Sequence, residues 1–134
     1  MKKNKHKSKI SEEFVADNAK NINKADFNKI NRKRKRLQKI LNLKVFVDQK
    51  EKLKLLLELL KQYKSGNYKT IPWRSVTSIT FTLLYIINPF DIVPDILPVV
   101  GYVDDISVFM ALMRLIDEDV KDFKQWKSTQ QVPQ

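Results

Sequence analysis

The sequence predicts a small all-α protein, in which a basic helical arm precedes an apolar helical hairpin joined by a corner rich in proline and aspartate. Two observations favour helices: the 134 residues include only two glycines, and β-branched residues do not alternate with polar ones as in half-buried strands. A chain of this length can bury one core. We therefore expect a single helical body.

Charge divides the chain into an arm and a body. Residues 1–54 carry 18 Lys/Arg against 6 Asp/Glu, a net charge of +12, whereas residues 55–134 carry 8 against 9. We expect four segments: a disordered basic tail at 1–10, a basic amphipathic helical arm at 11–44, a helical domain at 45–127 and a disordered tail at 128–134. No apolar run of about 7 to 15 residues follows the basic start, so we expect a membrane-associated or cytoplasmic protein that is not secreted.

The arm is predicted to contain two helices. The first covers residues 11–22, and Asn23 with Asp26 three residues later is a capping-box start signal for the second. The second helix carries one apolar stripe and, on its other sides, the basic run "RKRKR". The stripe is Phe27, Ile30, Leu37 and Leu41, and the basic run is Arg32, Lys33, Arg34, Lys35 and Arg36.

Two helices are predicted in the first part of the body. The stretch from 45 to 66 forms a helix that ends at Gly66, because glycine adopts the left-handed conformation at little cost. Thr70 is a candidate N-cap for the next helix, with Pro72 in its first turn. That helix, "WRSVTSITFTLLYII", is the most apolar stretch of the chain.

The final helix is predicted to begin at Asp104 or Asp105 and to continue to about residue 127. Its acidic residues at 117–119 precede lysines at 121, 124 and 127, the order that suits pairing between residues four apart. The apolar helix before it leaves the question of membrane contact open. Its uncharged run, 75–90, has 16 residues, fewer than the roughly 20 of a spanning helix.

The segment "NPFDIVPDILPVVGYVDD", residues 88–105, connects these two apolar helices. Pro94 and Pro98 are four residues apart, so a continuous helix would break there. The aspartates can cap the short turns that remain. Alternatively, Asp91, Asp95, Asp104 and Asp105 form a Mg²⁺ or Ca²⁺ site, since both ions prefer oxygen ligands. Asp91 or Asp95 could also pair with Arg74 or Arg114.

The spaced residues of this segment resemble the motif of the YkvA-like family, an uncharacterised bacterial domain. The motif residues are Pro89, Asp91, Pro94, Asp95, Pro98, Gly101, Asp104 and Asp105. The resemblance extends over roughly residues 55–127, with Asn88 where the family has serine. The resemblance implies no established activity. It implies an apolar helical hairpin, and because of this hairpin members of the family are often taken to be membrane proteins.

Composition narrows the chemistry further. Cysteine is absent and His6, in the basic tail, is the one histidine, which removes thiolate and histidine-based catalysis. No small-molecule substrate is identified, and a noncatalytic role is favoured. The basic run at 32–36 could contact an anionic membrane surface, an unknown protein partner or the phosphates of nucleic acid.

Three hypotheses therefore stand. The leading one is a noncatalytic membrane-associated or interaction module. The alternatives are a Mg²⁺- or Ca²⁺-dependent activity at the clustered aspartates and nonspecific nucleic-acid binding through the arm.

Overall fold

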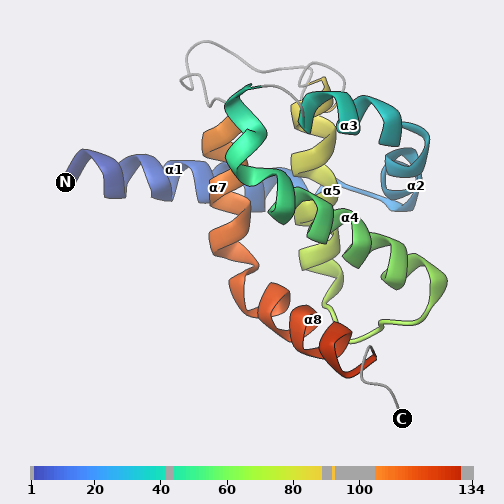
Figure 1. The fold of residues 1–134 in the computed structure, drawn as a ribbon. Helices are drawn as coiled ribbons and strands as arrows, with labels where there is room; N and C mark the ends of the chain where they lie inside the picture. The colour runs from blue at the N-terminus through green and yellow to red at the C-terminus, as the bar shows by residue number, and fades with distance from the viewer. Residues whose placement is uncertain (1, 42–43, 89–91, 93–104, 131–134) are drawn as a thin grey trace.

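The computed structural model of the protein describes residues 2–41, 44–88, 92 and 105–130. Seven α-helices and one 3-10 helix make up the secondary structure of this part, with no strand, which confirms the all-α fold class. The elements are α1 (Lys2–Ala19), α2 (Lys24–Arg32), α3 (Arg34–Leu41), the 3-10 helix η1 (Lys44–Gln49), α4 (Lys50–Ser65), α5 (Trp73–Ile87), α7 (Asp105–Leu115) and α8 (Asp117–Gln130). Figure 1 shows α5 at the centre, with α3 beside its C-terminal end and α8 toward its N-terminal end.

Helix α5 is surrounded by other helices. Every residue from Ser75 to Ile86 is buried, and α1, α2, α3 and α7 all contact the helix. A helix that is apolar on all sides is stable only when other elements cover it. The bounds of α5, Trp73–Ile87, are those of the apolar helix that the sequence predicts. The corner predicted between α5 and α7 lies outside the described residues.

The prediction of Thr70 as the N-cap of α5 is wrong. Pro72 takes the cap position in an extended conformation, with φ −64° and ψ 148°. Its carbonyl accepts hydrogen bonds from the N–H groups of Ser75 and Val76, at 3.0 and 3.2 Å. The fixed φ of proline suits this position, so the helix begins at Trp73 and not two residues earlier.

Three of the buried hydroxyl side chains of α5 donate hydrogen bonds to carbonyls of the helix's own backbone, whereas the hydroxyl of Thr82 has no such partner. Thr77 and Ser78 both donate to the carbonyl of Arg74, at 3.0 and 2.8 Å, and Thr80 donates to the carbonyl of Val76 at 2.8 Å. Bonds of this kind satisfy a hydroxyl without a partner from another helix. The polar residues that lower the hydropathy of α5 therefore do not prevent its burial.

The predicted arm and the predicted body contribute to one hydrophobic core. Val15, Ile30 and Leu37 are buried in the same cluster as Leu53 of α4 and Phe109 of α7. Helix α1 packs against both α5 and α7. The division of the chain at residue 44 remains a prediction, and in the structure the arm covers part of the central helix.

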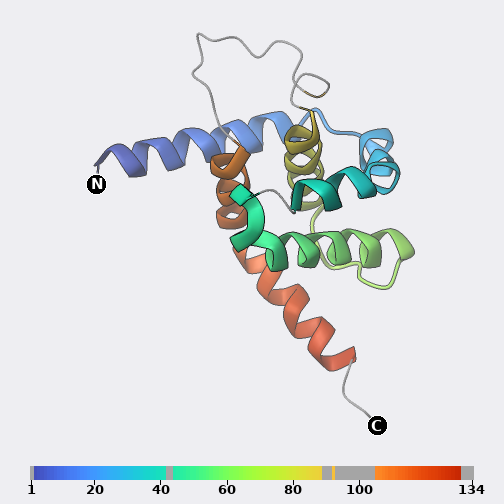
Figure 2. The same ribbon diagram turned by 45° about the horizontal axis from the view of Figure 1, so that its top comes forward.

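The terminal helices extend farther than the sequence predicts. Helix α1 begins at Lys2, nine residues before the expected start at Ser11, and its N-terminal half extends away from the other helices in both views (Figures 1 and 2). Helix α8 continues to Gln130. Composition predicts disorder in these stretches. However, lysine and glutamine have good helix propensity and here continue helices that the core already holds.

Two helices that the sequence predicts as continuous are bent. The second arm helix is divided at Lys33 into α2 and α3, and the final helix is divided at Ile116 into α7 and α8. Backbone hydrogen bonds cross both bends, from Leu37 to the Lys33 carbonyl at 3.1 Å and from Val120 to the Ile116 carbonyl at 2.9 Å. Neither bend contains the proline or glycine that usually marks one in a sequence.

Local sequence signals are confirmed where they involve neighbouring turns. The side chains of Asn23 and Asp26 each accept the other's backbone N–H, at 2.9 and 3.1 Å, and form the predicted capping box of α2. The ammonium group of Lys121 lies 3.0 Å from the carboxylate of Asp117. This hydrogen bond and the negative charge of Asp117 raise the pKa of Lys121, as expected for a favourable pair four residues apart.

Gly66→Ala is expected to destabilise the protein by about 1 kcal/mol. Gly66 ends α4 in the left-handed conformation, with φ 84°, where a Cβ atom is unfavourable although it would meet only the side chain of Lys69, at 3.9 Å. Urea denaturation measures the change in free energy of unfolding. Lys52→Ala, an exposed substitution in the first turn of α4, is the control and should change stability by less than about 0.5 kcal/mol. Equal effects of the two substitutions would contradict the assignment.

Candidate functional site

The predicted motif of prolines and aspartates lies mostly outside the described residues. This applies to Pro89, Asp91, Pro94, Asp95, Pro98, Gly101 and Asp104. Asp105 is half-buried in the first turn of α7, where the helix dipole favours a negative charge. In the part of the chain that the structure describes, no group of three or more His, Cys, Asp or Glu residues could hold a metal ion. Ion binding by the four aspartates therefore stays a prediction.

The basic run at 32–36 forms part of a groove. Arg32, Lys33 and Arg36, together with Lys29, line a hollow of about 630 Å³ whose remaining described lining is Leu84 and Ile92. We call this the basic groove. It lies beside the last turns of α5, a helix with no basic residue of its own in its last turn. Since the C-terminal end of a helix carries partial negative charge, cations from α2 and α3 are favourable there.

The other two residues of the basic run point elsewhere. Arg34 lines a narrow crevice on another side of α2 and α3, together with Lys61 and Lys64 of α4. Lys35 is exposed. The five consecutive charges are thus distributed over more than one face, as expected from about 100° of rotation per helical residue. Three of the five share the basic groove.

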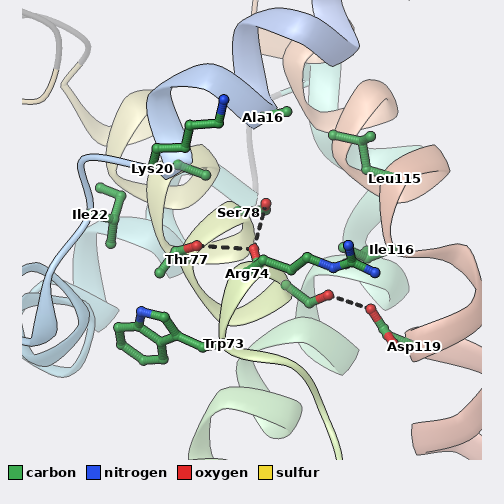
Figure 3. A pocket seen from close by; sticks show the side chains of 12 residues that line it. Ala16, Lys20, Ile22, Trp73, Arg74, Thr77, Ser78, Leu115, Ile116 and Asp119 are labelled. Carbon is green, nitrogen blue, oxygen red and sulfur yellow. Dashed lines mark hydrogen bonds between the residues drawn. The ribbon is translucent and has the colours of Figure 1, made fainter.

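A second pocket, of about 540 Å³, lies at the opposite end of α5 (Figure 3). We call it the α1–α5–α8 pocket. Its walls come from the end of α1, the first turns of α5 and the bend between α7 and α8. The lining residues are Ala16, Ala19, Lys20, Ile22, Trp73, Arg74, Ser75, Thr77, Ser78, Leu115, Ile116 and Asp119.

Polar groups in this pocket come from segments far apart in the sequence. The hydroxyl of Ser75 donates a hydrogen bond to the carboxylate of Asp119, across 44 positions of the chain. Figure 3 shows the Arg74 side chain extending across the pocket toward α8. Its guanidinium group makes no hydrogen bond or ion pair with another described residue. These residues belong to no local sequence motif, and for that reason the pocket was not predicted from the sequence.

The two arginines that could have paired with the corner aspartates differ in their described contacts. Arg114 donates from Nε to the carboxylate of Glu12 at 2.9 Å and so joins α7 to α1. Both side chains are partly exposed, by 41% for Arg114 and 32% for Glu12, so the pair contributes little to stability, about 0 to 1 kcal/mol. Asp91 and Asp95 lie outside the described residues, so the pairing of either aspartate with Arg74 or Arg114 stays a prediction.

None of the described helices combines the length and apolar character needed to cross a membrane.

The fold and the central segment place the chain in a class of small all-α proteins. A sequence profile described as "Protein of unknown function (DUF1232)" matches residues 75–111, from the buried part of α5 into α7. Through this segment the chain is similar to the DUF1232 family, and this match, together with the relative described next, confirms the resemblance to YkvA-like proteins.

A relative in Bacillus subtilis (strain 168) is named "Uncharacterized membrane protein YkvA". It is 27% identical to this chain over 70 residues, which cover 52% of this chain and 66% of the relative, slightly less than two thirds of its length. No solved structure matches the chain significantly.

Proposed function

We propose that the protein is a noncatalytic module that binds anionic membrane surfaces through the basic groove. The observation that carries the proposal is the gathering of Lys29, Arg32, Lys33 and Arg36 around one hollow, with no acidic side chain among its described lining residues. Arginine forms two parallel hydrogen bonds with phosphate oxygens, so such a hollow suits a phospholipid headgroup.

Charge around the groove supports the same proposal. Residues 24–41, which include α2 and α3, carry eight Lys/Arg and one acidic residue, Asp26. Asp26 lies 3.6 Å from Lys29 and offsets one of these charges. Each Lys or Arg near an anionic leaflet contributes about 1 kcal/mol, so a surface with this excess of basic residues favours reversible binding at moderate salt.

The name of the relative is consistent with this location. YkvA of Bacillus subtilis is called a membrane protein, and it matches this chain over 70 residues. For this chain we propose surface association, in which the basic groove faces the lipid headgroups while α5 remains covered by its neighbours. An unidentified protein partner at the membrane would be compatible with the same surface.

Neutralising Arg32 and Arg36 together is expected to weaken binding to anionic vesicles by about thirtyfold, because two charges contribute about 2 kcal/mol. The variant R32Q/R36Q is compared with the unmodified protein by cosedimentation with phosphatidylcholine vesicles that contain phosphatidylglycerol. Binding should weaken as salt is added and be absent with phosphatidylcholine alone.

The matched control is K124Q/K127Q, which removes the same charge from α8, at the other end of the molecule (Figure 1). Its affinity for the vesicles should stay within about threefold of that of the unmodified protein, because these two charges act on the membrane only through the long-range electrostatic field. Equal loss in both variants would mean that net charge, and not the groove, determines binding. Tight binding to a single-stranded oligonucleotide without binding to vesicles would replace the membrane by nucleic acid as the partner.

A further inference from the structure

We propose that the α1–α5–α8 pocket binds a monomeric amphiphilic anion, with its apolar tail on the pocket floor and its carboxylate or phosphate head beside Arg74. The pocket volume of about 540 Å³ lies within the range of small-molecule sites, about 300 to 1,000 Å³. This site is separate from the basic groove, since the two lie at opposite ends of α5. The proposal therefore does not depend on membrane binding.

The apolar part of the pocket is suited to a hydrocarbon tail. Small side chains of α1 leave space on its floor, which consists of Ala16, Ala19, Ile22 and Ile116. At the rim, Trp73 is 40% exposed and Leu115 is 41% exposed. Within the described residues, these are two of the three large hydrophobic side chains that are exposed, and both border the same hollow. Exposed apolar side chains gathered at a concave site commonly mark ligand contact.

The bend at Ile116 directs α8 toward the N-terminal end of α5. Figure 1 shows α8 turning from the direction of α7 to lie below α5, where Ser75 donates a hydrogen bond to Asp119. The first turns of α5 then form the wall between α1 and α8, as Figure 3 shows. The cavity is thus a consequence of the packing and not of one element.

Charges around the pocket favour an anionic head. Arg74 has no ion-pair partner among the described residues, and Lys20 pairs with Asp17 at a distance of 3.7 Å on an exposed surface, where such pairs are weak. The one carboxylate of the lining, Asp119, already accepts a hydrogen bond from the hydroxyl of Ser75. The lining therefore contains two cations and one carboxylate that is already hydrogen-bonded.

The helix dipole acts in the same direction. The pocket lies at the N-terminal end of the 15-residue helix α5, where no side chain caps the backbone. The positive end of the dipole favours a bound anion there.

The test uses the full-length Trp126→Phe protein, in which Trp73 is the remaining tryptophan and reports directly on the pocket. Decanoate below its micellar concentration should change the Trp73 fluorescence saturably. Decanol, which lacks the charge, should bind about tenfold or more weakly, and decyltrimethylammonium more weakly still.

Substitutions at two positions separate the apolar and charged contributions. Arg74→Gln should weaken decanoate binding about tenfold and leave decanol unchanged, while Arg74→Lys should retain most of the affinity. Ala16→Leu should weaken both ligands, because its side chain fills the floor. Lys69→Gln, an exposed change of the same charge outside the lining, is the matched control and should bind as the parent does. Thermal unfolding followed by circular dichroism verifies that each variant is folded.

The origin of the ligand is tested with phosphatidylglycerol vesicles. If the ligand is a free anion, Arg74→Gln and Ala16→Leu leave vesicle binding unchanged; if it is a lipid taken from the bilayer, both variants weaken it. R32Q/R36Q should bind decanoate as the parent does, so failure of the membrane proposal would leave this one intact. Equal affinity for decanoate and decanol, or no effect of Arg74→Gln, would overturn the proposal.

Discussion

Removal of α1 is expected to abolish cooperative unfolding of the protein. A chain that begins at residue 23 lacks Val15 and Ala19, which are buried against the core, and Phe14, whose ring meets the rings of Phe81 and Tyr85 at 5.6 and 5.3 Å. Without α1, one side of the most apolar helix would face water. The stabilisation lost with these buried contacts exceeds the few kcal/mol of net stability that a domain of this size usually has.

The matched control is a chain that lacks only residues 1–10. The N-terminal half of α1 extends away from the other helices (Figures 1 and 2), so this shorter deletion should change the free energy of unfolding by less than about 1 kcal/mol. Urea denaturation and the binding of a fluorescent hydrophobic dye measure both chains. Cooperative unfolding of the chain that begins at residue 23 would show that α1 is a separate appendage and not part of the core.

Phe81→Ala is expected to lower the free energy of unfolding by about 3 to 5 kcal/mol. Phe81 is 1% exposed at the middle of α5, and its ring contacts those of Phe14 and Tyr85. Alanine would remove the ring and leave a cavity between α1 and α5, where helix packing on both sides limits collapse. A loss of this size is a large fraction of the total stability of a small protein.

Leu115→Ala is the control for this substitution. Leu115 is also a large apolar residue on a helix, but it is 41% exposed and lies at the rim of a pocket. Its truncation should cost less than about 1.5 kcal/mol, since little apolar surface returns to water. Chemical denaturation of both variants gives the comparison. Equal costs would be inconsistent with a central position of α5.

The two proposed sites differ in how well the sequence predicts them. The basic run at 32–36 was identified from its charge alone, yet its distribution depends on the bend at Lys33 and on the packing of α2 and α3 against the end of α5. The α1–α5–α8 pocket was missed altogether. Its polar residues, such as Lys20, Arg74 and Asp119, belong to three separate helices and follow no spacing rule.

The sequence by itself determined those features that depend on interactions within one or two helical turns. The capping box of Asn23 and Asp26, the left-handed end of α4 at Gly66 and the pair of Lys121 with Asp117 all join residues at most four apart. The extent of α5 was predicted for a related reason, because a continuous apolar stretch must be buried.

Only the tertiary structure decided where the helices bend and which distant residues meet. The bends at Lys33 and Ile116 contain no proline or glycine, and backbone hydrogen bonds continue across them, so their local cost is small and packing selects their positions. The bond from Ser75 to Asp119 and the ion pair of Arg114 with Glu12 join residues 44 and 102 positions apart. Such contacts form only after the core has brought their helices together, because burial of apolar surface, and not the pairs themselves, supplies most of the free energy of folding.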